Sequence, residues 1–190
     1  MKNYFFGIAT IIVLILVGGA VFIWSGVYNT GADVPHWKIT YLLLEEARDR
    51  SISHYSRDIK APSPKGEAAL ETGFDHFHEM CRLCHGAPGF ERREFAEGLY
   101  PSPPLLDSDK VQKELGYVEL LWVVTNGLKM TGMPSFSKTH TDDQIRDIVA
   151  FVEHLPDLGP KGYMEMLRTA EKNAPEKHDH GRDKGTGEAG

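Results

Sequence analysis

The sequence predicts a helical protein that begins with a membrane-spanning helix and continues into one globular domain. The apolar run from Tyr4 to Trp24 contains no charged residue, and its length suits the hydrocarbon core of a bilayer, which is ~30 Å thick. Beyond it, apolar residues recur at helical spacing in segments separated by Pro and Gly. The chain has 190 residues, so enough remain after the apolar run for one domain with a modest core.

The N-terminal segment, residues 1–28, is predicted to be an uncleaved membrane anchor. Lys2 is the only charge before the apolar run, which favours an N-terminus that stays in the cytoplasm. Trp24 and Tyr28 would then lie at the outer interface of the membrane. The alternative is a cleaved signal peptide, but the apolar run is long for one and no clean cleavage site ends it.

Residues 29–64 are predicted to form a helical stalk or linker, with a helix from about Asp33 to Asp58. Apolar residues recur there at helical spacing: Ile39, Leu42, Leu43 and Ala47. Charged residues fill the outer face. The segment is a stalk, a helix that packs on the following domain or on a partner, or a solvated spacer. A Pro-rich break then precedes the next domain.

The run Cys81-Arg82-Leu83-Cys84-His85 has the spacing of a c-type haem attachment site. Two thiols one helical turn apart can add to the two vinyl groups of a porphyrin, and the adjacent imidazole then lies under the iron as its proximal ligand. These are the only two cysteines of the chain. The alternatives are a disulfide, a zinc site completed by His76 or His78, and a thioredoxin-like redox motif, which would need flanking strands.

A second motif supplies a candidate for the sixth iron ligand. Met133 lies between Gly132 and Pro134, in a loop that can pass close to a flat macrocycle. A thioether ligand favours reduced iron and raises the reduction potential. Met130 is the alternative ligand, and both methionines are apolar fillers if neither binds iron.

The stretch from about Gly66 to Leu158 resembles a class I cytochrome c domain. The resemblance rests on four patterns: Gly73-x-x-x-Phe77-x-x-x-Cys81, Cys-x-x-Cys-His-Gly, Gly-Met-Pro-Ser-Phe, and a terminal helix holding Phe151. It is closest to single-haem domains tethered to bacterial membranes, including haem subunits of terminal oxidases. It implies an all-α class I cytochrome c fold around one covalent haem c, ligation by His85 and Met133, and one-electron transfer. The haem domain is expected at residues 65–158.

Three helices are expected in this domain, over about residues 66–81, residues 117–127 and residues 141–155. Gly73 in the first of them is expected to permit a close crossing with the last, where Phe151 would lie against Gly73 and Phe77. Gly127 is a typical C-terminal stop. The sequence Thr141-Asp142-Asp143-Gln144 is a capping box that opens the last helix.

Two further residues are candidates for contacts with the haem site. The Pro-rich loop after His85 can supply a carbonyl for the free ring N–H of that histidine, and Pro104 resembles the family position in Pro-x-Leu. The doubled prolines stiffen a surface turn if this interpretation is wrong. Trp122 resembles the Trp that hydrogen-bonds a haem propionate in similar cytochromes, with ordinary packing as the alternative.

Charge and resemblance together suggest the setting of the protein. Between Lys65 and Asp157 the sequence has nine Lys/Arg and sixteen Asp/Glu, a net charge of −7, which suits basic partner surfaces and argues against nucleic acid. We expect a bacterial inner membrane, the haem domain on the periplasmic side, and partners such as a quinol-oxidising complex, a dehydrogenase or a terminal oxidase. The chain would be an electron carrier and not itself an enzyme. Alternatives are a haem subunit of a larger oxidoreductase and a haem sensor of small molecules.

The C-terminal segment, residues 159–190, is expected to contain a short helix and then a polar tail. Two interpretations of the run His178-Asp179-His180 in this tail are open: a loose metal-binding site, or part of a disordered polar terminus.

Overall fold

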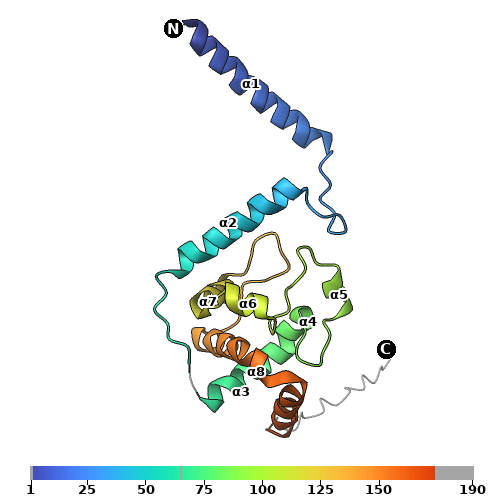
Figure 1. The fold of residues 1–190 in the computed structure, drawn as a ribbon, viewed down its shortest axis with the longest axis vertical. Helices are drawn as coiled ribbons and strands as arrows, with labels where there is room; N and C mark the ends of the chain where they lie inside the picture. Colours follow the sequence, from blue (N-terminus) through green and yellow to red (C-terminus); the bar gives the residue numbers. More distant parts are fainter. Residues whose placement is uncertain (1, 65, 174–190) are drawn as a thin grey trace, which may run out of the picture. The chain divides into compact units, whose positions relative to one another are not determined.

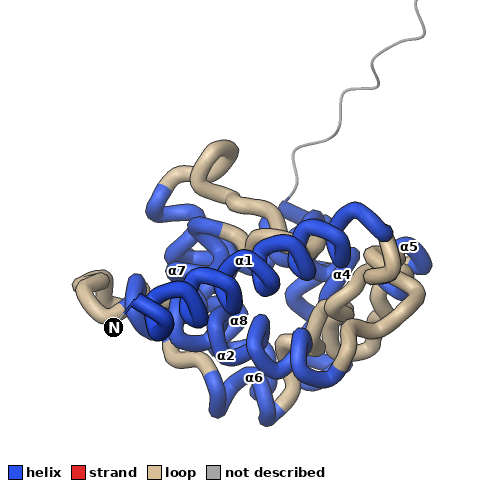
Figure 2. The backbone as a smooth tube through the Cα atoms, turned by 90° about the horizontal axis from the view of Figure 1, so that it is seen from above, coloured by secondary structure: helices blue, strands red, loops and turns tan. Residues whose placement is uncertain are grey.

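The computed structural model describes residues 2–64 and 66–173. The predicted tail motif at residues 178–180 lies outside the described residues. The chain forms two compact units, one ending at Glu45 and the other beginning at Glu46, and each is described by itself. The described parts consist of helices and loops without any strand, apart from an isolated bridge between Ala87 and Phe90 (Figures 1 and 2). The predicted all-α class is thus confirmed.

The helices follow one another along the chain in this order: α1 (Lys2–Ser25), α2 (Lys38–Ser56), α3 (Glu67–His76), the π-helix η1 (Phe77–Cys81), α4 (Arg82–His85), α5 (Glu94–Glu97), α6 (Asp109–Glu114), α7 (Tyr117–Asn126) and α8 (Asp142–Asn173).

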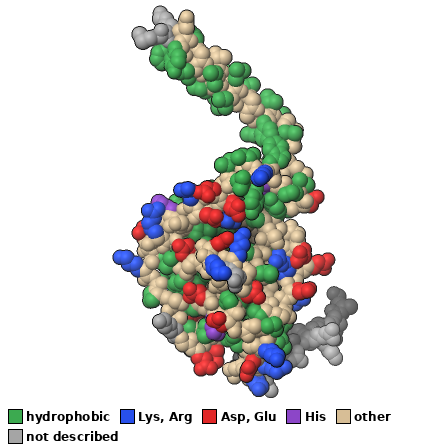
Figure 3. Space-filling model, in the orientation of Figure 1, with side chains coloured by type: hydrophobic (Ala, Val, Ile, Leu, Met, Phe, Trp, Pro, Cys, Tyr) green, Lys and Arg blue, Asp and Glu red, His purple; other side chains and the backbone are tan. Residues whose placement is uncertain are grey.

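The first unit contains α1, which covers the predicted apolar run. Within the described residues, Asn3–Ser25 is the helix that is long and apolar enough to cross a membrane, with 23 residues. At ~1.5 Å per residue such a helix reaches about 35 Å. Its apolar side chains are exposed to the surroundings rather than packed in a protein core, as the space-filling view shows (Figure 3).

The helix α2 is shorter than predicted, because it begins at Lys38 rather than near Asp33. Pro35 biases the residue before it away from helical geometry, and a turn closed by the Val34 N–H and the Gly31 carbonyl (3.2 Å) occupies the preceding residues. The apolar side chains of its first turns are exposed, whereas Ile52 near its C-terminal end is buried.

In the second unit, the close crossing predicted at Gly73 is confirmed. A Cβ added to Gly73 would lie 2.2 Å from the carbonyl oxygen of Asp147 and 2.8 Å from Cβ of Phe151, so only glycine permits this approach of α3 to α8. The rings of Phe77 and Phe151 lie 5.2 Å apart at the crossing. The first domain helix was expected to be one element to residue 81, but it is α-helical only to His76 and then widens into η1.

Together with α3 and α8, the helix α7 encloses the core, and α8 contacts both α3 and α7. Four apolar side chains of α7 are buried as predicted: Leu120, Leu121, Val123 and Val124. The helix ends at Gly127, whose positive φ of 68° is a conformation that glycine adopts more readily than other residues.

The helix α8 begins with the predicted capping box, in which the Thr141 N–H donates to Gln144 Oε1 (2.9 Å) and the Gln144 N–H donates to Thr141 Oγ1 (3.3 Å). It was expected to end near Pro156, but it continues to a break at Gly159 (φ 56°) and resumes to Asn173. Pro160 stands at the first position of the resumed helix, where a missing N–H costs nothing.

The resumed part of α8 belongs to the same core. Tyr163 is fully buried, and its ring lies 5.2 Å from that of Phe74 and 5.5 Å from that of Phe90. Sequence periodicity did not anticipate this, because the break at Gly159 interrupts the apolar pattern.

Candidate functional site

The two cysteines and His85 lie on consecutive helical turns. Cys81 is the last residue of η1, where it packs against the hydrophobic core, and Cys84 and His85 end the short helix α4. Both thiols are free. Burial, with a smaller effect of Cys84, raises the pKa of Cys81 to about 12, and burial also raises the pKa of Cys84. Both side chains are therefore neutral thiols at neutral pH, and that of Cys81 packs against the apolar interior.

The imidazole of His85 is oriented by one hydrogen bond. Its Nδ1–H donates to the carbonyl oxygen of Pro104 at 2.7 Å, and since a carbonyl can only accept, the proton must be on Nδ1. Burial lowers the pKa of His85, although the bond to Pro104 acts against this, so the ring is neutral. The lone pair of Nε2 thus remains available for a metal, and the bond fixes the ring orientation.

The loop after His85 is folded back so that Pro104 can meet the histidine. Gly86 has a φ of 70°, and a Cβ there would lie 3.1 Å from the carbonyl oxygen of Phe90. The Arg93 N–H donates to the Leu83 carbonyl (2.8 Å), which ties the returning chain to α4. Glycine is therefore required immediately after the histidine.

Arg92 is a further part of this loop that sequence reasoning missed. Its guanidinium donates to Ser102 Oγ (2.8 Å) and lies 3.6 Å from Glu97, and its side chain is only 17% exposed. The positive charge also contributes to the lowered pKa of His85. No motif marks Arg92 in the sequence, because its role depends on a loop whose course is not periodic.

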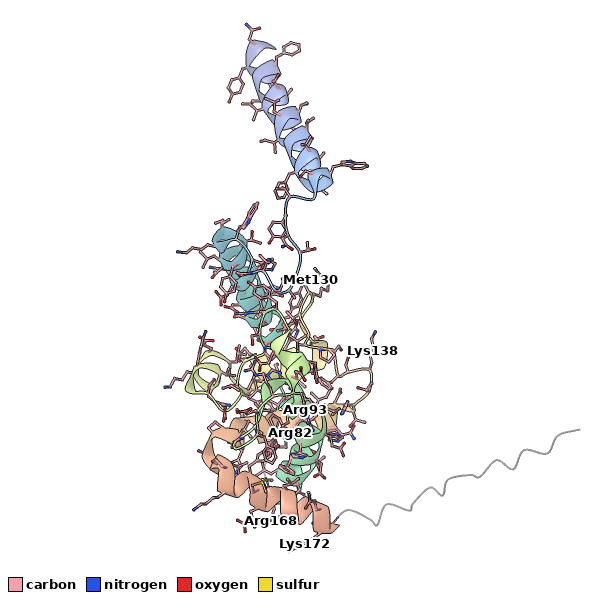
Figure 4. All side chains as sticks on the ribbon, turned by 90° about the vertical axis from the view of Figure 1, so that its right-hand side faces the viewer. Arg82, Arg93, Met130, Lys138, Arg168 and Lys172 are labelled. Carbon is pink, nitrogen blue, oxygen red and sulfur yellow. The ribbon has the colours of Figure 1, made fainter. Side chains whose placement is uncertain are left out.

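The structure separates the two methionines of the second motif. Met133 is partly buried and packs against the core, which Cys81 also contacts. Met130 is 96% exposed and has a φ of 61°. Figure 4 shows it far from Arg82, which begins α4. Of the two, Met133 is therefore the one placed with the apolar interior.

The backbone around Met133 is held in place by hydrogen bonds within the loop and to α7. Its carbonyl accepts from the Leu128 N–H (3.1 Å), and its N–H donates to Thr131 Oγ1 (3.1 Å). The Phe136 N–H and the Ser135 hydroxyl bond to carbonyls of α7 at 3.2 and 2.8 Å. A short polar loop thus positions an apolar side chain.

The loop that follows His85 and the loop that holds Met133 meet at one point. A Cβ added to Gly132 would lie 3.0 Å from two carbons of Leu99. The glycine before Met133 therefore has a packing role here, in addition to its backbone freedom.

The ring contact of Trp122 is with Tyr55 and not with Cys81, Cys84 or His85. Trp122 is partly buried, and its ring stacks on that of Tyr55 with centroids 5.9 Å apart and planes 12° apart. This contact favours the packing alternative, and the bond of Trp122 to a propionate stays a prediction.

A second histidine, His78, forms part of the aromatic packing around Tyr163. Its Nδ1 lies 3.0 Å from the hydroxyl of Tyr163, and its ring stacks on Phe74 with centroids 5.5 Å apart. Arg82 lies over the ring of Phe90, 5.2 Å from its centroid. The bond to Tyr163 could not be foreseen, since 85 residues separate the partners.

The geometry gives little support to the three alternatives for the cysteine pair, which are a disulfide, a zinc site and a thioredoxin-like redox motif. The thiols are unpaired, the pair lies at a helix junction rather than after a strand, and His78 already bonds to Tyr163. Among the described residues, no group of three or more His, Cys, Asp or Glu is arranged to hold a metal ion.

Comparison with known families supplies an independent finding. Residues 68–152 match the family model described as "Cytochrome C oxidase, cbb3-type, subunit III". The matched stretch includes the cysteine pair, His85, Pro104, Trp122 and Met133. No curated protein sequence matches the chain.

Proposed function

We propose that this chain is a membrane-anchored one-electron carrier. The match of residues 68–152 to a cytochrome family model supports a c-type cytochrome domain, and such a domain implies haem c and electron transfer rather than catalysis. One haem would be attached covalently through Cys81 and Cys84, and His85 and Met133 would bind its iron. The observation that carries the proposal is the 2.7 Å bond from His85 Nδ1 to Pro104, since it leaves Nε2 as the metal-binding atom.

The residues present fit this group. Two free thiols one turn apart stand beside a neutral imidazole whose ligating nitrogen carries no proton, and a thioether packs against the same core. A c-type haem, when bound, supplies an iron that gains and loses one electron.

Each residue has a separate task in this arrangement. Cys81 and Cys84 fix the position of the ring, and the Pro104 carbonyl fixes the orientation of His85. Met133 offers a soft sulfur ligand that favours the reduced state and raises the potential. The apolar core adds to this effect because it disfavours the extra positive charge of the oxidised state.

The proposed setting is the bacterial inner membrane, with α1 as a single anchor and the cytochrome domain on the periplasmic side. An anchor raises the local concentration of a carrier near membrane redox complexes. Partners with basic docking faces suit the charge of −7 over residues 65–157. On the face seen in Figure 3, acidic and basic side chains are interspersed, so any steering there depends on net charge rather than on one patch.

A second candidate function is a fixed haem subunit of a larger oxidoreductase. The description of the matching family, which names an oxidase subunit, favours it. In this case the chain would accept electrons for one complex instead of shuttling between several. Gentle solubilisation of native membranes separates the two: a subunit co-purifies in fixed ratio with a terminal oxidase, and a carrier does not.

The test of the proposed function is spectroscopic. The protein purified from its native membrane is expected to keep haem stain after denaturing electrophoresis. In its oxidised state it should show the weak long-wavelength band typical of thioether-ligated ferric iron. A high-spin spectrum without this band would contradict ligation by Met133 and would favour a haem sensor with an open sixth position.

A further inference from the structure

In the first turns of α2, apolar side chains cover more than half of the helix circumference, and Lys38 and the Tyr41 hydroxyl lie on the remaining side. Between Lys38 and Glu45 the sequence reads Ile-Thr-Tyr-Leu-Leu-Leu, and its aliphatic side chains are exposed: Ile39 by 62%, Leu42 by 48%, Leu43 by 64% and Leu44 by 54%. At 100° per residue, Leu42 and Leu43 flank Ile39 on one side, while Leu44 points well away from them. The next six residues, Glu45 to Arg50, include five charges.

An apolar arc this wide needs apolar surroundings over more than half of the circumference. A groove on a protein partner would cover part of this arc and leave the rest in water. Lipid at the membrane interface can cover the whole arc while Lys38 and the Tyr41 hydroxyl stay among the headgroups. The distribution of side chains therefore favours lipid over a protein as the occupant.

An aromatic cluster holds the start of α2 beside the end of α1. Phe22, in the last turn of α1, has its ring 6.0 Å from that of Trp37, the residue before α2. Tyr28 lies 5.1 Å from Trp37 in an edge-to-face contact, and its hydroxyl lies 2.7 Å from His36 Nδ1. The first turn of α2 is thus at the level where α1 ends.

We propose that residues 39–44 of α2 are immersed in the membrane interface, next to the point where α1 leaves the bilayer. This rests on the proposed anchoring by α1. Trp24, Trp37 and Tyr28 then form the aromatic belt that is typical of membrane–water interfaces, and Lys38 reaches toward the headgroups. The charged turns from Glu45 onward lie in water.

Cysteine reactivity in nanodiscs that hold one haem-loaded chain each tests this. The attached haem blocks Cys81 and Cys84. Three variants carry one new thiol each: L14C in α1, L43C in α2, and S53C in the exposed, polar part of α2 as the matched control. Rates with a charged maleimide are normalised to those of the unfolded chain. We expect L43C to react at least tenfold more slowly than S53C and about as slowly as L14C.

The outcomes distinguish this proposal from the one on which it rests. A fast L43C beside a slow L14C overturns the immersion of α2 and leaves the anchor intact. A fast L14C overturns the anchor itself. Brominated lipids settle what covers a slow L43C: they should quench a fluorophore at position 43 more than one at position 53. Equal quenching would mean that protein covers the helix and would overturn the proposal.

Discussion

The segment that carries His85 and the loop that carries Met133 are built in different ways. In the first, both thiols and the imidazole lie within five consecutive residues, and one polar bond to Pro104 orients the imidazole. In the second, no hydrogen bond orients the Met133 side chain. Its backbone is held instead, by hydrogen bonds to the Leu128 N–H and to the Thr131 hydroxyl. The first should therefore decide whether haem is attached, and the second should adjust its potential.

The largest effect is expected from Cys84→Ser. Removing one thiol leaves a single possible thioether, so most covalent haem should be lost. Haem staining of a denaturing gel, normalised to the amount of chain, measures this. Wild-type staining with unchanged stability would show that Cys84 takes no part in attachment. It would contradict the view that the cysteine segment decides whether haem is attached.

Met133→Ala should leave haem attached and lower the reduction potential. The expected change is on the order of 0.1 V, a fraction of the ~0.8 V range set by axial ligands. Redox titration of the purified protein measures it. The matched control is Met130→Ala, since Met130 is 96% exposed and should have no effect. Equal potentials in both variants would remove Met133 as a ligand.

Gly73→Ala tests the framework that supports the cysteine segment. The new Cβ would lie 2.2 Å from the Asp147 carbonyl oxygen, so α3 and α8 must move apart. We expect a loss of about 1–3 kcal/mol in the free energy of unfolding, measured by denaturant titration. The control Gly98→Ala, whose Cβ would meet only the Phe95 carbonyl oxygen at 3.6 Å, should change stability little. A loss as large in the control would show that the crossing is not the cause.

Tyr163→Phe should produce the smallest effect. It removes the hydroxyl bonded to His78 and keeps the ring in the core, which predicts a loss of about 1 kcal/mol in the free energy of unfolding. Tyr55→Phe is the control, because this side chain is 62% exposed and keeps its stacking on Trp122. Identical stabilities would show that the bond between His78 and Tyr163 contributes nothing.

The sequence predicts the parts of this molecule that depend on short-range pattern. The helix α7 with its stop at Gly127, the capping box at Thr141 and the Gly73 crossing were all anticipated and are confirmed. The haem role of the cysteine segment stays a prediction, although its bond to Pro104 is present.

Other parts could not be predicted because they depend on distant residues or on loop course. The burial of Tyr163 requires the chain to turn at Gly159 and return to the core, and nothing in the local pattern records this. The π-helical turn before Cys81 has no spacing signature of its own. Arg92 acquires its partners, Ser102 and Glu97, only once the loop after α4 has folded.

The intact mass of the protein isolated from its native membrane tests the central claim most directly. The account predicts a mass equal to that of the chain plus one haem, with the added mass on the proteolytic fragment that contains residues 81–85. An intact mass equal to that of the polypeptide alone would contradict it.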